Sequence, residues 1–280
     1  GRALKKIPVM LDVHEQTIEA WVRDDPDFDP GLTFEELAQE APTPEKKGEV
    51  AALLRGTDLS VNWLDGYMTG VVIAPQVRVL EAIRELEIDV PYVTLQNADV
   101  GGAEHSMSVD QFAGARMATQ HLIDLGHTEI MHISGPQDWI EAEARMQGYL
   151  DAINAADLRT RAPILGDWSA HFGYYAGLEL LRLRDFTAVF ASNDQMALGF
   201  MHACWDSGLD VPGDISVVGF DDIPEAAHFY PPLTTIRQNF AEIGRRAVSL
   251  LLAELQGVEV DHGKIVPELV VRRSTAAPHH

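Results

Sequence analysis

In the second half of this chain, short continuous apolar runs alternate with stretches in which apolar residues recur every three to four positions. The first pattern is typical of strands buried on both faces, and the second is typical of amphipathic helices. Between Thr187 and Gln238, the run 188–191 is followed by Met196, Phe200 and Cys204 at helical spacing. A strand over 188–191 and a helix after it are therefore predicted.

Polar residues mark the ends of this helix. Ser192, Asn193 and Asp194 offer side-chain oxygens that can cap its start, and Gly208 stands where a left-handed residue would end it. The next strand is predicted over 215–220, with Asp221 after it. A strand, helix, strand order predicts parallel pairing, which gathers the loops after successive strands at one edge of the sheet. Asn193 and Asp221 are expected to meet there, although a plain cap and a plain loop residue would explain them equally.

The same patterns predict further elements along the chain. Strands are expected over 7–13, 70–74, 91–95, 129–134, 163–165 and 267–272, and helices over 33–40, 45–55, 77–86, 137–154, 170–183 and 241–256. A further helix begins after Ser108 or Asp110, either of which could cap it, and ends before Gly126. This alternation indicates an α/β fold, and 280 residues leave room for two domains.

Composition narrows the class of protein. An apolar content of 46% with 23% charged residues is typical of a globular domain. No apolar run approaches the roughly 20 residues of a membrane span, and no secretory signal is recognisable, so a cytoplasmic protein without a membrane partner is expected. The single cysteine, Cys204, lies within a predicted helix, excludes an internal disulfide and is typical of a buried apolar filler.

Charge argues against nucleic-acid binding by these residues. The chain has 21 Lys and Arg against 43 Asp and Glu, a formal net charge of −22. Gripping a phosphate backbone requires clustered basic residues. We therefore expect this chain alone not to bind DNA.

Several motifs resemble one family. They are SNDQMALG, ISVVGFDDIPEA, PPLTTIRQ and PELVVRRST, with SVDQFAGARMATQHLIDLGHTEIMHISGPQ at 108–137 and RMQGY at 145–149. In this order they resemble the ligand-binding core of the lactose-repressor/galactose-repressor family of transcriptional regulators. The resemblance covers about 70–280, whereas residues 1–69 do not share it clearly.

The resemblance implies a periplasmic-binding-protein-like (type I) fold of two Rossmann-like lobes with parallel sheets, joined by three hinge crossings. The expected lobes are 1–107 with 238–266 and 108–237 with 267–280. The family's DNA-binding helix-turn-helix module is not present in this chain, although Arg2–Lys6 resembles the end of its hinge helix. A homodimer is implied, with contacts near 71–90 and 198–230.

The resemblance also implies a ligand site at the sheet edge. Arg145 matches the family's ligand-gripping arginine, whose planar fork suits vicinal hydroxyls or a carboxylate; an internal salt bridge is the alternative. Trp168 matches the ligand-facing aromatic residue, and Gln96 stands where the family often has an acid. The expected ligand-binding residues are Trp139, Glu141, Arg145, Trp168, Asn193, Asp221, Gln238, Phe240 and Gln96.

Flat apolar rings beside polar anchors suit a small sugar-like effector, which in this family controls operator binding allosterically. A purine or nucleoside effector is the second possibility, and a periplasmic-type sugar-binding transport protein is a third. No catalytic motif is present, so neither an enzyme nor a cofactor is expected. Replacing Asp221 or Arg145 by alanine is expected to abolish sugar binding with little change in melting temperature.

Two groups of residues suggest metal ligands at first sight. Asp25, Asp27, Asp29 and Glu36 have the spacing of a calcium loop, but Pro30 stands where that loop needs glycine. His121, His127 and His132 fall on three different predicted elements without paired spacing. We therefore expect an acidic turn, ordinary histidines and no metal.

Overall fold

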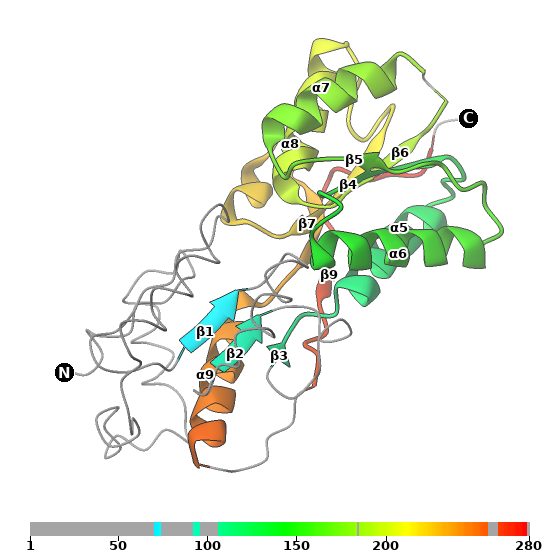
Figure 1. Ribbon diagram of the computed structural model, residues 1–280. Coiled ribbons are helices and arrows are strands. Elements are labelled where there is room, and N and C mark those ends of the chain that lie inside the picture. The colour runs from blue at the N-terminus through cyan, green and yellow to red at the C-terminus, as the bar shows by residue number, and fades with distance from the viewer. Residues whose placement is uncertain (1–69, 74–91, 96–105, 184, 257–262, 279–280) are drawn as a thin grey trace. The chain divides into compact units, whose positions relative to one another are not determined.

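The computed structural model describes residues 70–73, 92–95, 106–183, 185–256 and 263–278 (Figure 1). The chain divides into two compact units. Unit 1 comprises Gly1–Ser108 and Asn239–Lys264, and unit 2 comprises Val109–Gln238 and Ile265–His280. The chain thus passes between the units three times, and Gln238, expected in the first lobe, belongs to unit 2.

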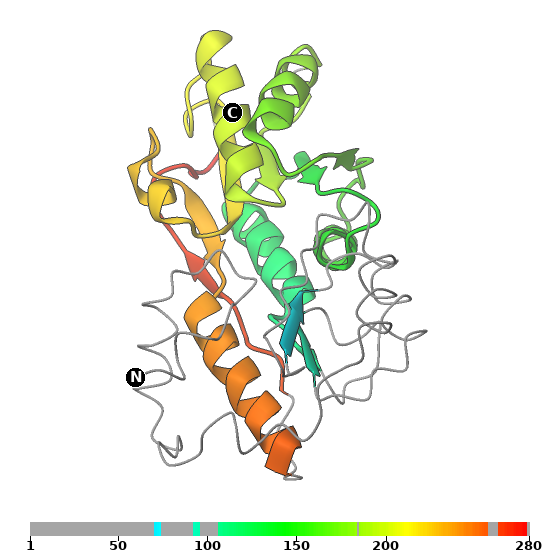
Figure 2. The same ribbon diagram turned by 60° about the vertical axis from the view of Figure 1, so that its left-hand side comes forward.

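Unit 1 contains a small parallel sheet in the order β1-β2-β3. Its strands are Gly70–Ile73, Tyr92–Leu95 and Ser106–Met107, and helix α9, Phe240–Gln256, packs against them (Figure 2). The expected elements over 7–13, 33–40, 45–55 and 77–86 lie outside the described residues, as do the acidic segment 25–36 and Gln96.

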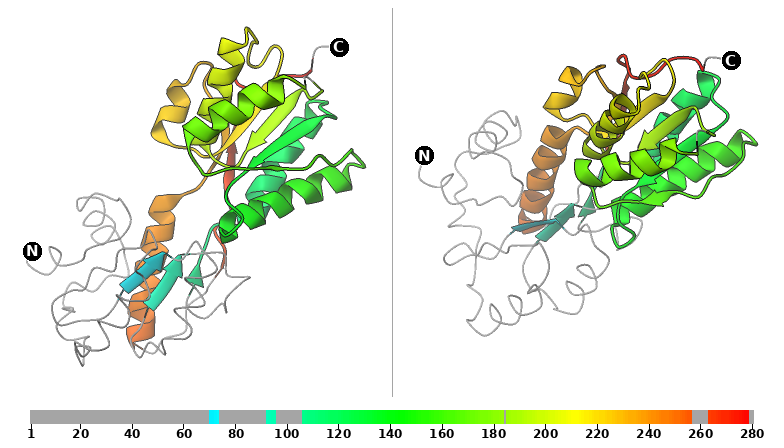
Figure 3. Two further views of the ribbon diagram at one scale, coloured as in Figure 1. Left: turned by 45° about the horizontal axis from the view of Figure 1, so that its top comes forward. Right: turned by 90° about the horizontal axis from the view of Figure 1, so that it is seen from above.

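Unit 2 is built around a six-stranded sheet in the order β5-β4-β6-β7-β8-β9. The strands are β4 Ile130–Ser134, β5 Ile164–Leu165, β6 Ala188–Ala191, β7 Ser216–Asp221, β8 Thr234–Arg237 and β9 Glu268–Val270. The helices are α5 Gln111–Asp124, α6 Ile140–Ala155, α7 Ala170–Leu181, α8 Asp194–Asp206 and the short 3-10 helix η4 Pro224–His228. Helices α5 and α6 cover one face of the sheet, and α7 and α8 cover the other (Figure 3).

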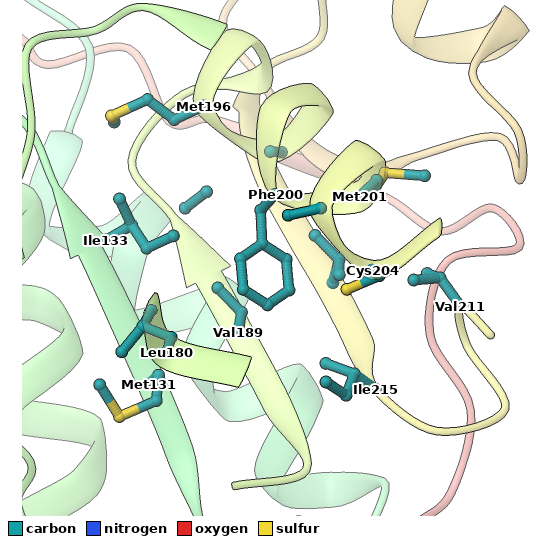
Figure 4. Close-up of a cluster of buried hydrophobic side chains, with 14 of the residues drawn as sticks. Met131, Ile133, Leu180, Val189, Met196, Phe200, Met201, Cys204, Val211 and Ile215 are labelled. Carbon is teal, nitrogen blue, oxygen red and sulfur yellow. The ribbon is translucent and has the colours of Figure 1, made fainter. Parts of the chain in front are cut away.

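The continuous apolar runs reflect burial on both faces of this sheet. Along β6, Val189 packs into a cluster with α7 and α8, whereas its neighbour Phe190 packs into a cluster with α5 and α6. Phe200 of α8 reaches down beside Val189 in the first cluster, and Cys204 lies one turn further along (Figure 4). Cys204 is fully buried, as its position in an amphipathic pattern predicted.

The predicted helix ends are largely correct. The side chain of Asp110, not that of Ser108, caps α5 by accepting a hydrogen bond from Ala113 N at 2.9 Å. Asn193 caps α8 through Met196 N at 2.8 Å, so Asp194 is the first helical residue. Gly208 follows α8 with φ of +70°, the left-handed conformation that its position predicted.

Three details differ from the sequence-based expectations. The segment over 137–139 forms a turn, closed by Trp139 N donating to Pro136 O at 3.2 Å, so α6 begins at Ile140 rather than at Gln137. Residues 234–237, expected only as a crossing, form strand β8. Strand β9 pairs antiparallel with β8, so this sheet is not wholly parallel. Because β8 leaves unit 2 at its carboxyl end and the chain re-enters at Ile265, β9 runs in the opposite direction.

The three histidines have structural partners. His127 hydrogen-bonds with Thr187 Oγ1 at 2.8 Å and with Ser216 Oγ at 3.0 Å. His132 stacks between two aromatic rings, and burial lowers its pKa to about 4, so the ring is neutral. His121 contacts Thr275 Oγ1 at 3.0 Å. Within the described residues, no group of three or more potential ligands is arranged to hold a metal ion.

Candidate ligand-binding site

The sheet of unit 2 has a switch point in its connections between β4 and β6. These strands are neighbours, yet the helix after β4 lies on one face of the sheet and the helix after β6 lies on the other. The two loops therefore diverge at the carboxyl ends of the strands, where ligands of open α/β sheets bind. Arg145 of α6 and Asn193 of α8 come from the two sides of this point.

Arg145 is the centre of the site, and its side chain is almost wholly buried. Its Nε donates to Gln111 Oε1 at 2.8 Å, its Nη1 donates to the carbonyl oxygen of Ser192, and its Nη2 lies 3.5 Å from Asp221 Oδ1. The guanidinium also lies over the ring of Phe220, 3.9 Å from its centroid. Burial lowers the pKa of Arg145, and the nearby carboxylates of Asp221 and Glu141 oppose that shift. Both expected roles of Arg145 are thus compatible, because the internal ion pair lies within the site.

Asp221 ends β7 in a strained conformation, with φ of +113°. Its Oδ1 accepts from Gln238 Nε2 at 2.6 Å as well as facing Arg145. Burial raises the pKa of Asp221, while Arg145 and Gln238 oppose the shift by stabilising the carboxylate. The side chain remains 22% exposed, and among the described residues Oδ2 accepts no hydrogen bond. One carboxylate oxygen is therefore held and the other is available to a hydroxyl group.

Of the adjacent acids Asp221 and Asp222, only Asp221 is a candidate for binding a ligand. Arg237 Nε and Arg272 Nη2 each donate to its carboxylate at 2.6 Å, one to each oxygen. Its side chain is only 7% exposed. Both oxygens are thus occupied by ion pairs that join β8 and the C-terminal segment, which indicates a structural role.

Trp168 forms the aromatic wall of the site. Its φ of +72° is unusual for a bulky residue, and its carbonyl accepts from Asn193 Nδ2 at 2.9 Å. The indole lies directly on Gly135, where a Cβ atom would come within 2.2 Å of the ring. Its Nε1 is buried and meets no acceptor among the described residues. The close packing on Gly135 holds the ring in place, and the N–H group is left for a ligand oxygen.

A second indole adjoins the first. Trp139 meets Trp168 edge to face, with 5.4 Å between ring centroids. Trp139 occupies the N-cap position of α6 but makes no side-chain cap, although Ser, Asp or Asn there would contribute about 1 kcal/mol. The two indoles together form one aromatic corner of the site. The Cζ atom of Arg145 lies over the Trp168 ring, 5.5 Å from its centroid.

Seven of the nine expected residues are brought together by these contacts. They are Trp139, Glu141, Arg145, Trp168, Asn193, Asp221 and Gln238. Phe240 begins α9 in unit 1 and is 46% exposed, and Gln96 lies outside the described residues. Sequence reasoning missed Gln111, which bonds Arg145, and Phe220, which lies under the guanidinium, because nothing in their local pattern distinguishes them from an ordinary helix residue and an ordinary strand residue.

Comparison with known proteins agrees with this architecture. The family model described as "periplasmic binding protein-like domain" matches residues 119–275. The lactose operon repressor of Escherichia coli K12 is 39% identical over 168 residues, covering 59% of this chain and 47% of the repressor. The regulator CelR of Thermobifida fusca is 38% identical over 196 residues, covering 67% of this chain and 57% of that protein.

Solved structures show the same likeness. A dimeric lac repressor with an 11-residue C-terminal deletion superposes with a TM-score of 0.72 at 28% identity, covering 97% of each chain. A complex of CelR with cellobiose gives a TM-score of 0.68 at 30% identity, covering 83% of this chain and 71% of that one. The chain spans about half the length of the curated relatives it matches. It belongs to the periplasmic-binding-protein-like domain family, in the form that makes up the effector-binding core of lactose-repressor-type transcriptional regulators.

Proposed function

We propose that this chain binds a small sugar-like effector through unit 2 and passes the binding signal to a DNA-binding module of a transcriptional regulator. The arrangement of Arg145, Asp221 and Trp168 at the carboxyl ends of the strands carries the proposal. A flat indole suits the C–H face of a sugar ring, while a carboxylate and a guanidinium suit its hydroxyl groups. The site is proposed as a binding site rather than a catalytic one. A hydroxyl does lie beside a base there, with Ser192 Oγ 3.4 Å from His132 Nε2, but both side chains are fully buried and so are not presented to a ligand.

The proposed role in transcription follows from the relatives rather than from this site. The solved relatives include a lac repressor dimer bound to operator and an anti-inducer. With a net charge of −22, the present residues are unsuited to contacting phosphates themselves. We therefore assign DNA recognition to a helix-turn-helix module outside this sequence, and place the regulator in the cytoplasm. Within the described residues, no helix is long and apolar enough to cross a membrane.

A purine or nucleoside is the second candidate effector, because the corner formed by Trp139 and Trp168 could stack a base as well as a sugar. The HTH-type transcriptional repressor PurR of Mannheimia succiniciproducens is 38% identical over 170 residues, covering 59% of this chain and 51% of that protein. The polar groups favour the sugar: Arg145 and Asp221 present a paired cation and anion, which suit several adjacent hydroxyls better than a ring with few of them.

Titration calorimetry of the full 280-residue chain tests the proposal. The panel should include glucose, galactose, ribose, lactose and cellobiose, with adenine and guanosine as the competing class. At least one sugar should bind, and Asp221→Asn should weaken that binding at least about tenfold, since a hydrogen bond to a charged group contributes about 1.5–3 kcal/mol. Asp151→Asn, at an exposed pair with Arg116, is the matched control and should bind normally. Binding of purines alone would replace the sugar with the second candidate.

A further inference from the structure

Four side chains at the candidate site form a closed circuit of polar contacts. Arg145 Nε donates to Gln111 Oε1 at 2.8 Å, and Gln111 Nε2 donates to Gln238 Oε1 at 2.7 Å. Gln238 Nε2 donates to Asp221 Oδ1 at 2.6 Å, and that oxygen lies 3.5 Å from Arg145 Nη2. Gln111, Arg145 and Gln238 are each less than a tenth exposed, so water does not readily substitute for these bonds.

The chemistry at the two ends of the circuit fixes the direction of every bond. Arginine can only donate, so Gln111 must turn its amide oxygen toward Arg145 and its amino group toward Gln238. Gln238 must then accept from Gln111 with its oxygen, which leaves its amino group facing Asp221. An ionised carboxylate can only accept, so the orientation agrees at the last step. Gln111 and Asp221 therefore hold the Gln238 amide in one orientation from opposite sides, with its amino group facing the ligand anchor.

The circuit also lies beside the places where the chain leaves unit 2. Gln238 is the last residue before the second crossing, and Gln111 is the first helical residue after the first crossing. Next to Gln111, Asp110 N donates to Ile265 O at 2.9 Å, and Val109 bridges Ile265, the first residue after the third crossing. The N-terminus of α5 thus holds the unit 2 ends of all three crossings.

We infer that Gln111 is a positioning residue of the ligand site: it orients the amide of Gln238 as the donor to Asp221 and ties both anchors to the N-terminus of α5. This inference rests on the proposed function for its meaning, because the anchors matter only if a ligand uses them. The orientation itself exists without ligand and is measurable without one.

Nuclear magnetic resonance of the ligand-free full chain tests the inference through the side-chain N–H groups of Gln238 and Arg145. In the unaltered protein, both should exchange slowly with solvent. Gln111→Met, which keeps the length of the side chain but removes both bonds, should speed both exchanges at least about tenfold. Gln111→Glu can still accept from Arg145 but presents only acceptor oxygens to Gln238. It should therefore leave Arg145 Nε–H protected and turn the Gln238 amino group away from Asp221 toward residue 111.

A second readout follows the carboxylate of Asp221. With Gln238 no longer held, Gln111→Met should raise the pKa of Asp221 above its value in the unaltered chain, because a donor to the charged form is lost. A purely structural role for Gln111 would not produce this change. Thr119→Val provides the matched control, since Thr119 is buried in the same helix and donates only to Ala115 O at 2.9 Å.

These measurements distinguish a positioning role of Gln111 from a general loss of packing in α5. Unchanged protection of the Gln238 amino group in Gln111→Met, or equal effects in Thr119→Val, would overturn the inference. If Gln111→Met does not fold, Gln238→Leu gives the same test from the other side, because it should leave Arg145 Nε–H protected while exposing the amino group of Gln111. None of these measurements depends on sugar binding, so a failed calorimetric panel and a failed positioning role remain distinguishable.

Discussion

At the scale of single residues, the polar groups of the site are bound to one another. Arg145 is the clearest case, because its guanidinium meets Gln111, the carbonyl of Ser192 and Asp221 at once. Removing one partner of a buried ion pair leaves the other charged group without compensation. The expectation from sequence that Arg145→Ala would leave the melting temperature nearly unchanged therefore needs revision.

Arg145→Ala is now expected to lower the free energy of unfolding by about 3 kcal/mol, the loss typical of a broken buried ion pair. Urea denaturation followed by circular dichroism measures this loss. Arg116→Ala is the matched control, since Arg116 pairs with Asp151 at 2.8 Å with both side chains about half exposed, and such surface pairs contribute less than about 1 kcal/mol. Equal losses in the two variants would show that Arg145 makes no special contribution to stability.

Asp194 is a second buried acid beside the site. Its carboxylate accepts from Thr235 Oγ1 at 2.6 Å and from Ile223 N at 2.9 Å, and the side chain is fully buried. Burial, reinforced by Asp221 and Asp222, raises its pKa from 3.8 to about 7 despite those two donors. The folded protein therefore holds this proton through a range of pH in which the unfolded chain has lost it.

This difference gives stability a defined pH dependence. The contribution of protonated Asp194 is fully present below about pH 4 and is lost as pH rises toward 7, a total of about 4 kcal/mol at 1.36 kcal/mol per pH unit. Asp194→Asn imitates the neutral acid and should remove that part of the slope. Denaturation at pH 5, 6, 7 and 8 should show the variant gaining stability relative to the unaltered chain as pH rises. A constant difference between the two proteins would refute the raised pKa.

At the scale of elements, the sequence identified strands and helices well where burial is two-sided or a cap is present, as in β6, α5 and α8. Prediction from sequence was wrong for elements whose formation or direction depends on pairing with distant parts of the chain. Strand β8 is only four residues long, and it forms because it pairs with β7 and β9 from opposite sides. The antiparallel direction of β9 likewise depends on where the chain re-enters unit 2, which no periodicity records.

The packing of α7 on α8 requires glycine at the helix contact, although glycine has a low helix propensity. A Cβ atom at Gly199 would lie 1.9 Å from Ala170 O, and one at Gly173 would lie 2.2 Å from Met196 O. Backbones can approach this closely only without side chains, so both glycines stand at the contact between the two helices. An alanine in an exposed helix would instead be favourable by about 1 kcal/mol.

Gly199→Ala is therefore expected to destabilise unit 2 by about 2 kcal/mol through overpacking, although it raises helix propensity. Denaturant titration gives the loss. Gly208→Ala separates this effect from backbone strain, because Gly208 has φ of +70° and a Cβ atom added there would meet no other atom within 4 Å. Its loss should be about 1 kcal/mol, and Gly208→Asn should restore much of it. A Gly199→Ala protein as stable as the original would mean that the helices can move apart freely.

At the scale of the whole molecule, the fold class was predictable from the order of the elements, whereas most of the site was predicted through the resemblance to a family. Loops after successive parallel strands meet at one edge, which was enough to place Asn193 and Asp221 together. Arg145, Trp168 and Gln238 were assigned instead by the resemblance of their motifs to the family. Their individual bonds were not predictable. The link from Gln111 to Gln238 joins residues 127 positions apart, and its direction follows from side-chain geometry that a linear pattern does not contain.

Association of two copies is the remaining expectation at this scale, and the solved relatives include dimers. The proposed contact segment 198–230 contains large exposed apolar residues, with Leu198 at 37%, Trp205 at 70% and Tyr230 at 87% exposure. On the same side of unit 2, Tyr174 of α7 meets His202 of α8 at 4.8 Å between ring centroids. Aromatic residues are enriched in protein interfaces relative to the rest of the protein surface.

Analytical ultracentrifugation at micromolar concentration should therefore show a dimer. Leu198→Glu should dissociate it, because a charge placed in a desolvated contact without a partner is strongly unfavourable. Leu183→Glu is the matched control: Leu183 is a leucine exposed to 65% outside the proposed contact segments, and its replacement should leave the dimer intact. A monomer in the unaltered chain, or equal dissociation by both variants, would place the association surface elsewhere and would require the binding signal to reach DNA through a different contact between copies.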